Sequence, residues 1–191
     1  GFAGVPSHYQ ILLKKSQTFK HTVFPNLRYV TQAGGKLHTV FIEEFTKSFP
    51  NINFYVMYGQ TEATARLSYL DPNILSEKKG SIGKGIPNVK LKIINNEGNE
   101  VAIGMEGELI AKGSNVMLGY FKDEATTNET IKEGWLYTGD IAKKDHDGYI
   151  YLMARKKEII KVGGKRISPK EIEEVILSAP EVVDCSIVAI D

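Results

Sequence analysis

The chain has 191 residues, enough for one domain or two small ones, and apolar residues make up 42% of it, so it can bury a real core. Lys and Arg number 24 against 23 Asp and Glu, and this formal charge of +1 excludes net charge as a reason to expect nucleic acid or a membrane surface as partner. The sequence has one cysteine, no apolar run long enough to span a bilayer and no signal-peptide pattern, so we expect a cytoplasmic protein without an internal disulfide.

The first elements along the chain are a helix and a strand. Ser7 and Gln10 have the spacing of a capping box, and the apolar residues that follow predict a helix over residues 7–15. Residues 27–31 are rich in residues that favour β-structure, and they predict a strand.

A glycine turn and a second helix follow this strand. Gly34 and Gly35 provide the turn, and from Leu37 onward apolar residues recur at helical spacing. Residues 52–58 are nearly all apolar, as is typical of a strand covered on both faces. Strand, helix and strand in this order predict a βαβ unit in an α/β fold.

The middle of the chain has a different character. Short alternating runs are separated by glycine-containing turns, which is typical of antiparallel strands. These runs cover residues 89–94, 107–113 and 135–142. We therefore expect a small β-barrel-like subdomain after the α/β part.

A hairpin is predicted at Asp147 and Gly148, because an Asp-Gly pair between two strand-like runs favours a tight turn. Such a hairpin would bring Asp140 and Arg155 side by side, one to accept hydrogen bonds from hydroxyls and the other to donate to oxygens. That combination suits a nucleotide. The alternative for Asp140 is a local turn after Gly139, in which the carboxylate bonds its own backbone.

The string Tyr58-Gly59-Gln60-Thr61-Glu62 directly follows the second predicted strand. In α/β sheets, ligands bind at the carboxyl ends of the strands. An aromatic ring can stack on a base, glycine permits close approach, a hydroxyl can donate to phosphate, and a carboxylate suits Mg²⁺. An ordinary loop is the alternative interpretation of so short a string.

The last part of the chain starts with a basic run over residues 155–166 and continues with Ser168 and Pro169, which predict the start of a helix. The basic run has no aromatic residue that could stack on bases, so a solvated surface is a better interpretation than a nucleic-acid site. We expect this part to be the beginning of an α+β domain.

Three motifs in this order resemble the adenylate-forming acyl-CoA synthetase family. They are YGQTE (58–62), GWLYTGD (134–140) and RKKEIIKVGGKRISPKEIEEVI (155–176). The stretch GELIAKGSNVMLGYFKDEATTNET (107–130) also looks like the family's connection that contains a GYxxxxxxT pattern. The resemblance covers nearly the whole chain.

The resemblance implies roles for residues around a bound nucleotide. Tyr58 would stack on adenine and Thr61 would contact the α-phosphate region, beside Gly59. Glu62 would help to hold Mg²⁺. Asp140 would accept hydrogen bonds from the ribose hydroxyls, with Arg155 beside it.

The resemblance also implies roles away from the sugar. Gly34 and Gly35 match a glycine segment that passes the adenine and the acyl pocket. Lys157 occupies a hinge position, about which a small domain rotates between two half-reactions. Gly164 and Arg166 lie in a loop that this rotation brings toward the active site for the thioester step.

The implied activity joins a carboxylic acid to CoA. The acid attacks the α-phosphate of ATP to give acyl-AMP and pyrophosphate, and the CoA thiol then takes the acyl group; ATP, AMP, Mg²⁺ and CoA are the implied ligands. Two alternatives stay open. One is an adenylation domain that loads the thiol of a carrier protein, and the other is a non-catalytic nucleotide-binding module.

The implied division is a large domain over residues 1–154, with an α/β part (1–75) and a β-rich part (76–154), followed by a hinge and the start of a small domain (155–191). The family's phosphate-binding loop would precede residue 1, and its late catalytic lysine would follow residue 191. We therefore expect that the chain alone does not form acyl-adenylate.

Overall fold

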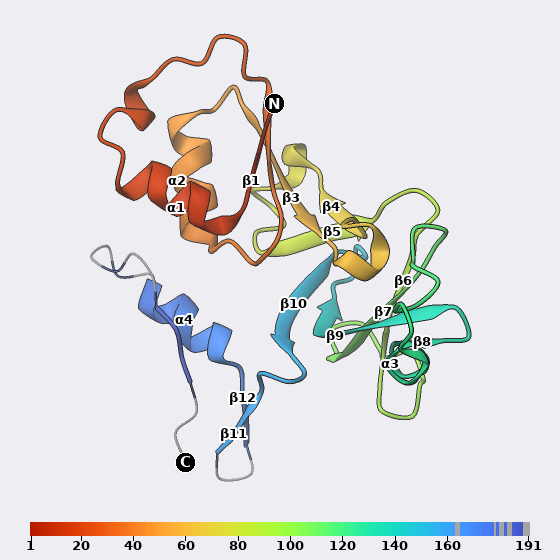
Figure 1. Cartoon of the computed structure of the whole chain (residues 1–191). Coiled ribbons are helices and arrows are strands. Elements are labelled where there is room, and N and C mark those ends of the chain that lie inside the picture. Colours follow the sequence, from red (N-terminus) through yellow and green to blue (C-terminus); the bar gives the residue numbers. More distant parts are fainter. Residues whose placement is uncertain (163–164, 178, 180–181, 183–184, 189–191) are drawn as a thin grey trace.

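The computed structural model describes residues 1–162, 165–177, 179, 182 and 185–188 (Figure 1). Its helices are α1 (Pro6–Lys14), α2 (Thr39–Ser48), α3 (Glu124–Thr130) and α4 (Pro169–Leu177), with short 3-10 helices η1 (Phe19–His21), η2 (Thr61–Ala63) and η3 (Pro72–Ile74). Its strands are β1 (Phe2–Gly4), β2 (Tyr29–Gln32), β3 (Asn53–Tyr58), β4 (Ser68–Leu70), β5 (Ser81–Gly85), β6 (Lys90–Ile94), β7 (Gly107–Lys112), β8 (Ile131–Lys132), β9 (Trp135–Lys144), β10 (Ile150–Arg155), β11 (Ile160–Val162) and β12 (Lys165–Ile167).

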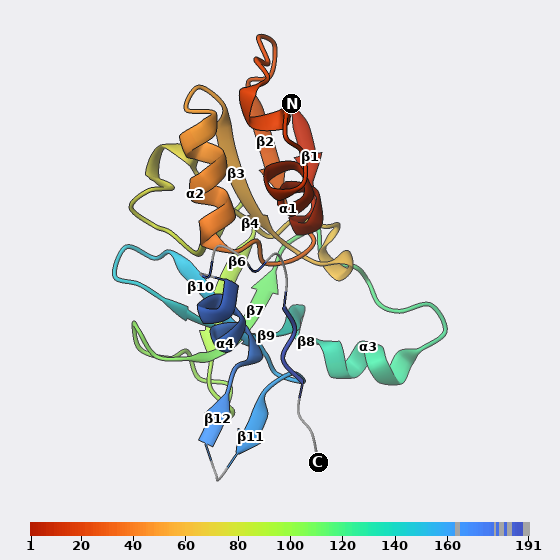
Figure 2. The same ribbon diagram turned by 90° about the vertical axis from the view of Figure 1, so that its left-hand side faces the viewer.

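The predicted βαβ unit is confirmed. β2 and β3 pair in parallel, with Val30 opposite Phe54, and α2 connects them. β1 adds a parallel strand on the other side of β2. Tyr9 of α1 and Phe45 of α2 are buried in one cluster with Val30 and Phe54, so both helices cover the same face of these strands (Figure 2). The carboxyl ends of β1, β2 and β3 therefore lie along one edge.

The first helix begins one residue earlier than predicted, and its start is held differently. α1 begins at Pro6, with Val5 extended before it, and the backbone N–H of Val5 donates to Nδ1 of His8 (3.4 Å). Ser7 lies inside the helix, so the predicted capping box from Ser7 to Gln10 is wrong. Proline suits the first helical position because its φ is already helical and it has no N–H to satisfy.

The predicted β-barrel-like subdomain is not confirmed, because the short strands extend the first sheet. β4 pairs antiparallel with β3 and with β5, and β5 pairs with β10. The sheet continues through β9 and β7 to β6, and β8 pairs with β9. No strand pairing in the described part of the chain joins β6 back to the start of this run, so no closed barrel is found. The fold is mixed α/β around one large sheet.

The predicted hairpin around Asp147 and Gly148 is confirmed. β9 and β10 pair antiparallel, and Gly148 has a φ of +83° in the turn. Asp145 Oδ1 accepts hydrogen bonds from the backbone N–H groups of Asp147 (3.0 Å) and Tyr149 (2.8 Å). Lys78 pairs with the carboxylates of Asp147 and Asp145, and these partners raise the pKa of its ammonium group. The turn is therefore tied to the segment that precedes β5.

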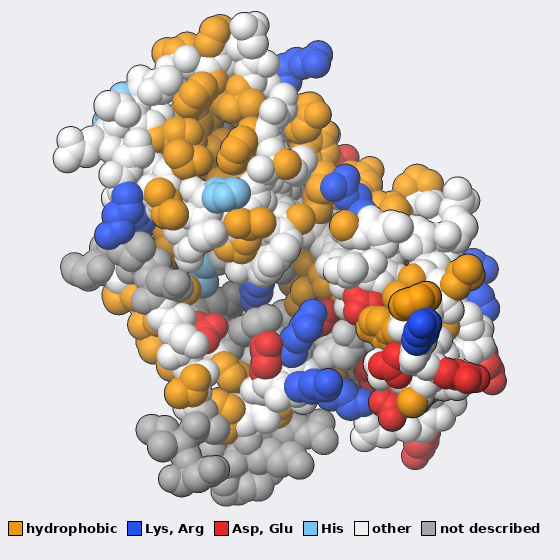
Figure 3. Space-filling model, viewed as in Figure 1, with side chains coloured by type: hydrophobic (Ala, Val, Ile, Leu, Met, Phe, Trp, Pro, Cys, Tyr) orange, Lys and Arg blue, Asp and Glu red, His pale blue; other side chains and the backbone are white. Residues whose placement is uncertain are grey.

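Two clusters of buried apolar side chains hold the sheet, and β3 contributes to both. Phe54 belongs to the cluster under α1 and α2, whereas Tyr58 belongs to the cluster of the β-rich part, with Leu109 and Leu136. Figure 3 shows hydrophobic side chains on the surface of the N-terminal part, and Asp and Glu side chains gathered on the β-rich part. One part of this surface is therefore rich in hydrophobic side chains and another in acidic ones, although the net charge of the chain is only +1.

The predicted helix start after Ser168 is confirmed, since α4 begins at Pro169. Between β10 and α4, strands β11 and β12 form a separate two-stranded sheet with Ile160 opposite Ile167. The Ser168 hydroxyl donates to the Met153 carbonyl (2.9 Å) and so ties the start of α4 to β10. No helix among the described residues is long and apolar enough to cross a membrane.

Replacing Gly83 by alanine should destabilise the protein more than the same change at Gly98. Both glycines have a positive φ, +82° and +85°, so the conformational cost for alanine is matched. A Cβ on Gly83 would lie 1.7 Å from the Tyr69 carbonyl oxygen, whereas a Cβ on Gly98 would meet nothing within 4 Å. We expect Gly83→Ala to lose about 1–3 kcal/mol more unfolding free energy than Gly98→Ala, by urea denaturation. Equal losses would contradict the crowded packing of β5.

Candidate functional site

Tyr58 ends β3 on the buried side of the sheet. The strand alternates, so Phe54, Val56 and Tyr58 face inward, and Tyr58 is 9% exposed. Its hydroxyl donates a hydrogen bond to Oδ2 of Asp140 (2.6 Å). The ring predicted to stack on adenine is thus mostly enclosed in this chain, and that role stays a prediction.

Asp140 lies within strand β9, so the alternative of a local turn is wrong. Gly139 has a φ of +73°, and the pairing of β9 with β7 shifts register between Tyr137 and Ile141, which is typical of a β-bulge. The Thr138 hydroxyl accepts from the backbone N–H of Asp140 (3.1 Å) and donates to the Leu109 carbonyl (2.7 Å). A buried hydroxyl therefore holds the bulge that directs the Asp140 side chain.

Arg155 lies beside Asp140, as the predicted hairpin requires. The two residues are opposite each other in the pairing of β10 with β9, and Arg155 Nε is 3.1 Å from Asp140 Oδ1. The Asp140 side chain is 7% exposed and the Arg155 side chain 52% exposed. The guanidinium group thus compensates a buried carboxylate while it remains open to a ligand.

Tyr58 and Arg155 together leave Asp140 with capacity to accept more hydrogen bonds. A carboxylate offers roughly four lone-pair sites, and each of its oxygens has one donor here. Burial, and then the Asp140 charge, raise the pKa of the Tyr58 phenol, so Tyr58 stays a neutral donor at ordinary pH. The free lone pairs could accept from the hydroxyls of a ligand.

The chain turns sharply after Tyr58, and this turn carries Thr61 and Glu62 in η2. A Cβ on Gly59 would lie 2.5 Å from the Ala65 carbonyl oxygen, so only glycine fits there. Thr64 and Ala65 have φ values of +49° and +64°, which non-glycine residues seldom adopt. Strained backbone of this kind persists only where its surroundings hold it.

The segment around Asn115 holds this turn in place. Asn115 Nδ2 donates to the carbonyls of Ala63 (3.1 Å) and Arg66 (2.8 Å), and the Thr64 hydroxyl donates to the Asn115 carbonyl (3.0 Å). The Met117 N–H donates to the Glu62 carbonyl (2.8 Å). The turn that carries Thr61 and Glu62 is therefore held by a segment that is distant in the sequence. Thr64 and Asn115, for example, are 51 residues apart.

Tyr120 is a site residue that the sequence analysis did not identify. Its hydroxyl donates to Glu62 Oε1 (2.6 Å), and this bond is the main cause of the raised pKa of its phenol. The Thr127 hydroxyl accepts from the Tyr120 N–H (2.8 Å) and donates to the Asp123 carbonyl (2.7 Å). The GYxxxxxxT spacing was a usable signal, because its Tyr and Thr prove to be hydrogen-bonded.

The other predicted residues lie around this centre. Gly34, with a φ of +80°, and Gly35 follow β2, so they share the sheet edge at which β3 ends. Gly34 borders a hollow of about 460 Å³ that Leu177 of α4 also lines. A larger hollow of about 550 Å³ lies against Asn53, at the opposite end of β3 from Tyr58.

The predicted hinge and loop residues lie beyond β10. Lys157 is in an exposed turn between β10 and β11. Gly164 lies outside the described residues. Arg166 is in β12, opposite Lys161, and the structure describes its backbone alone. The roles of Lys157, Gly164 and Arg166 therefore stay predictions.

The described residues contain no cluster of three or more His, Cys, Asp or Glu side chains that could hold a metal ion. Glu62 offers one carboxylate, with one oxygen bonded to Tyr120. Mg²⁺ is commonly held by one or two carboxylates together with substrate phosphates and water. Glu62 therefore fits a magnesium ion that arrives with a nucleotide, and it does not form a metal site alone.

Comparison with known proteins gives consistent matches. Residues 1–121 match the family model of the AMP-binding enzymes. The chain is 35% identical over 189 residues to the long-chain-fatty-acid–CoA ligase of Salmonella typhimurium. This match covers 98% of this chain and 33% of that protein. The chain spans 33–34% of the length of such curated relatives.

Two solved structures of o-succinylbenzoate CoA synthetase from Bacillus subtilis are similar in fold. One is a complex with the acyl-adenylate intermediate OSB-AMP, with a TM-score of 0.85, and the other is a complex with ATP and a magnesium ion, with a TM-score of 0.83. Each is 30% identical to this chain; the matches cover 96% and 95% of this chain and 37% of those chains.

Folding stability should fall as the pH rises above about 10, the ordinary pKa of a phenol. The pKa of Tyr58 is raised in the folded protein, so its stabilising contribution is complete below the unfolded pKa and is lost as the pH climbs toward the folded pKa. Urea unfolding between pH 9 and about 11 should show a shallower fall for Tyr58→Phe than for the unchanged protein, by up to about 1.4 kcal/mol per pH unit.

Tyr55→Phe is the matched control for that measurement, because Tyr55 lies on the opposite face of β3 and its hydroxyl has no recorded hydrogen bond in the described structure. It therefore controls for the loss of a phenol hydroxyl from β3 as such. Burial also raises the pKa of Tyr9, but Tyr9 is present in all three proteins, so its contribution to the pH dependence of stability is the same in each. The same slope for Tyr58→Phe as for the control would contradict the predicted titration.

Proposed function

This chain belongs to the AMP-binding enzyme family, and on that premise we propose that it is part of an ATP-dependent ligase that joins a carboxylic acid to the thiol of CoA. The observation that carries the proposal is the buried Asp140 carboxylate, which Tyr58 and Arg155 hold at the end of β3. The similar proteins named above are CoA ligases, one of them in complexes with ATP and an acyl-adenylate.

The proposed role of Asp140 is to accept hydrogen bonds from the 2′- and 3′-hydroxyls of ribose. The low exposure of its side chain supports this role, because hydrogen bonds to a carboxylate are stronger where water is excluded. Arg155 pairs with the carboxylate, and its own side chain is exposed enough to reach a ligand oxygen. Tyr58 holds the other oxygen, so the carboxylate cannot rotate away from the sugar.

The proposed role of the turn after Tyr58 is to hold the phosphates. Thr61 is exposed and could donate its hydroxyl to the α-phosphate, and Gly59 keeps the turn tight enough to bring it near the sugar site. Glu62 would hold Mg²⁺, which would neutralise phosphate charge. In the proposed reaction the acid carboxylate attacks the α-phosphate, pyrophosphate leaves, and the CoA thiol then displaces AMP from acyl-AMP.

We also propose that the chain divides at the end of β10, with residues 1–154 in a large domain and 155–191 in the start of a small one. An exposed turn that contains Lys157 follows β10, and the next strands form their own sheet, which supports a hinge there. Gly34 and Gly35 would pass the adenine and the acyl group, and Gly164 and Arg166 would serve the thioester step. CoA is favoured over a carrier protein as acceptor because the named relatives are CoA ligases.

The complete protein should convert ATP to AMP and pyrophosphate in the presence of a suitable carboxylic acid. Hydroxamate capture across an acid panel would detect acyl-adenylate, and chromatography would detect the acyl-CoA. The 191-residue chain alone should give no adenylate, because it spans about a third of its relatives. Adenylate without acyl-CoA would favour a carrier-protein acceptor, and absence of adenylate with every acid would contradict the ligase.

Asp140→Asn in the complete protein should weaken AMP binding about 10- to 100-fold, because hydrogen bonds to a charged acceptor are replaced by weaker ones. Isothermal titration calorimetry would measure the change. Asp147→Asn is the control, since Asp147 is an exposed carboxylate in the turn of the same hairpin. Unchanged AMP affinity in Asp140→Asn would refute the proposed sugar site.

A further inference from the structure

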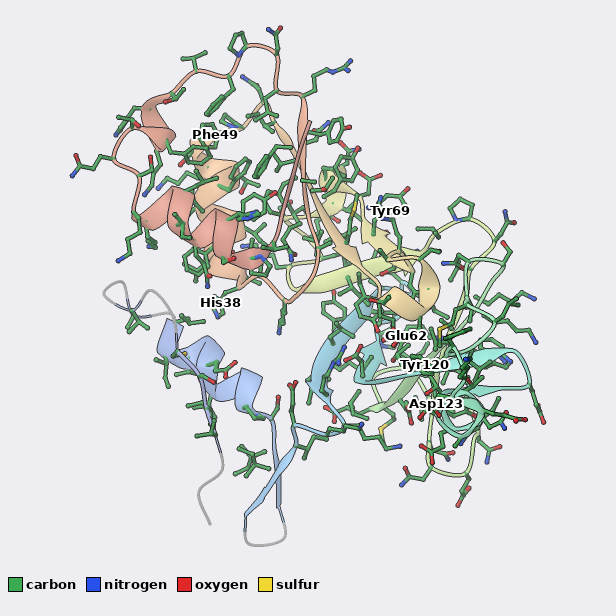
Figure 4. The ribbon with its side chains drawn as sticks, in the orientation of Figure 1. His38, Phe49, Glu62, Tyr69, Tyr120 and Asp123 are labelled. Atoms are coloured by element: carbon green, nitrogen blue, oxygen red, sulfur yellow. The ribbon has the colours of Figure 1, made fainter. Side chains whose placement is uncertain are left out.

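The side chains of Glu62 and Tyr120 meet beside α3, as Figure 4 shows. Tyr120 donates its hydroxyl to Oε1 of Glu62 at 2.6 Å, which is a short, charge-assisted hydrogen bond. No other hydrogen bond to the Glu62 carboxylate is recorded among the described residues, so Oε2 stays open. One phenol thus distinguishes the two oxygens of this carboxylate.

Tyr120 is itself held firmly. Its backbone N–H donates to the Thr127 hydroxyl of α3 (2.8 Å), and a Cβ on Gly119 would lie 2.7 Å from a Thr127 methyl carbon. Asp123 caps α3 by accepting from the Thr126 N–H (3.0 Å), and this bond lowers the pKa of its carboxyl group. The phenol therefore projects from a fixed backbone.

We propose that Tyr120 is a positioning residue for Glu62, and that its hydroxyl holds Oε1 so that Glu62 presents Oε2 alone to the Mg²⁺ ion of a bound nucleotide. The inference rests on the proposed function, because it takes Glu62 as the magnesium ligand. It adds a residue to that site, and it assigns the two carboxylate oxygens of Glu62 to different partners.

A Glu62 side chain held by Tyr120 should bind Mg²⁺ more tightly for two reasons, the side-chain freedom that binding removes and the coordination geometry that magnesium requires. A free glutamate loses several rotamers when it ligates an ion, whereas Glu62 is already held through one oxygen. Mg²⁺ requires near-octahedral geometry and usually keeps several waters, so a single oriented oxygen suits it. Residues that orient a ligand in this way typically change metal affinity about 10- to 100-fold when they are removed.

Losing the hydroxyl of Tyr120 should leave the turn itself folded. The Met117 N–H still donates to the Glu62 carbonyl (2.8 Å), and the Asn115 amide still bonds the carbonyls of Ala63 and Arg66. A phenylalanine ring would keep the packing of Tyr120. The substitution therefore separates orientation of the carboxylate from construction of the turn.

The test measures how strongly Mn²⁺, used as the probe for Mg²⁺, improves ATP binding by the complete protein. This coupling is the ratio of the ATP dissociation constant in EDTA to that in saturating Mn²⁺. Tyr120→Phe should lower the coupling about tenfold and leave ATP binding in EDTA unchanged. Tyr69→Phe, which removes a phenol hydroxyl with no recorded hydrogen bond in the described structure, should change neither value.

Glu62→Gln and the double variant with Tyr120→Phe complete the test. If Tyr120 acts through Glu62, Glu62→Gln lowers the coupling and adding Tyr120→Phe lowers it no further. If Glu62→Gln lowers the coupling and Tyr120→Phe does not, the positioning role is overturned while the magnesium ligand stands. If Glu62→Gln leaves the coupling unchanged, the proposed magnesium ligand itself fails.

A purely structural role for Tyr120 would also be visible. In that case Tyr120→Phe would weaken ATP binding in EDTA by the same factor as in Mn²⁺, and the inference would be overturned. Should Tyr120→Phe not fold, Thr127→Val gives a second measurement, because it removes the hydroxyl that holds the Tyr120 backbone. It should lower the coupling in the same direction and leave ATP binding in EDTA unchanged; an unchanged coupling would count against the inference.

Discussion

The hydrogen bonds that meet on the Asp140 carboxylate are the constraint on which the rest of the structure depends. A buried carboxylate without partners is destabilising by several kcal/mol, roughly, so the fold must supply donors. Tyr58 comes from 82 residues away and Arg155 from 15 residues away. Both hydrogen bonds form only if the end of the parallel strand β3 lies against the antiparallel β9–β10 hairpin. They therefore join the α/β part of the chain to its β-rich part.

This junction lies within one continuous sheet. β3 ends at Tyr58 on one side of Asp140, and β10 ends at Arg155 on the other, with β4 and β5 between the two strands in the sheet. The turn that leaves Tyr58 is then stabilised by Asn115 and Met117 instead of by its own sequence. Tyr58, which bonds the sugar-suited Asp140, is thereby followed within one short turn by Thr61 and Glu62, which suit phosphate and its metal ion.

The proposed function depends on how these groups are positioned more than on any single reactive side chain. Adenylate formation depends chiefly on positioning and on neutralising phosphate charge, and here the carboxylates of Asp140 and Glu62 are each oriented through a hydrogen bond to a neighbour. Thr138 orients Asp140, and Tyr120 bonds Glu62. The chain spans about a third of its relatives, so the proposed contacts with an acid, a thiol and the other phosphates are expected only in the complete protein.

The sequence by itself determined the elements whose causes are local. The apolar run before Tyr58, the glycines after β2 and the Asp-Gly turn predicted the βαβ unit and the hairpin, and the hairpin register brought Asp140 to Arg155. Tertiary structure decided the rest. Whether short strands close a barrel or extend a sheet depends on which edges pair, and the pairing of β5 with β4 and β10 brings together residues far apart in the chain. The contacts of Tyr58 with Asp140 and of Tyr120 with Glu62 span 82 and 58 residues, and no local propensity encodes a bond over such distances.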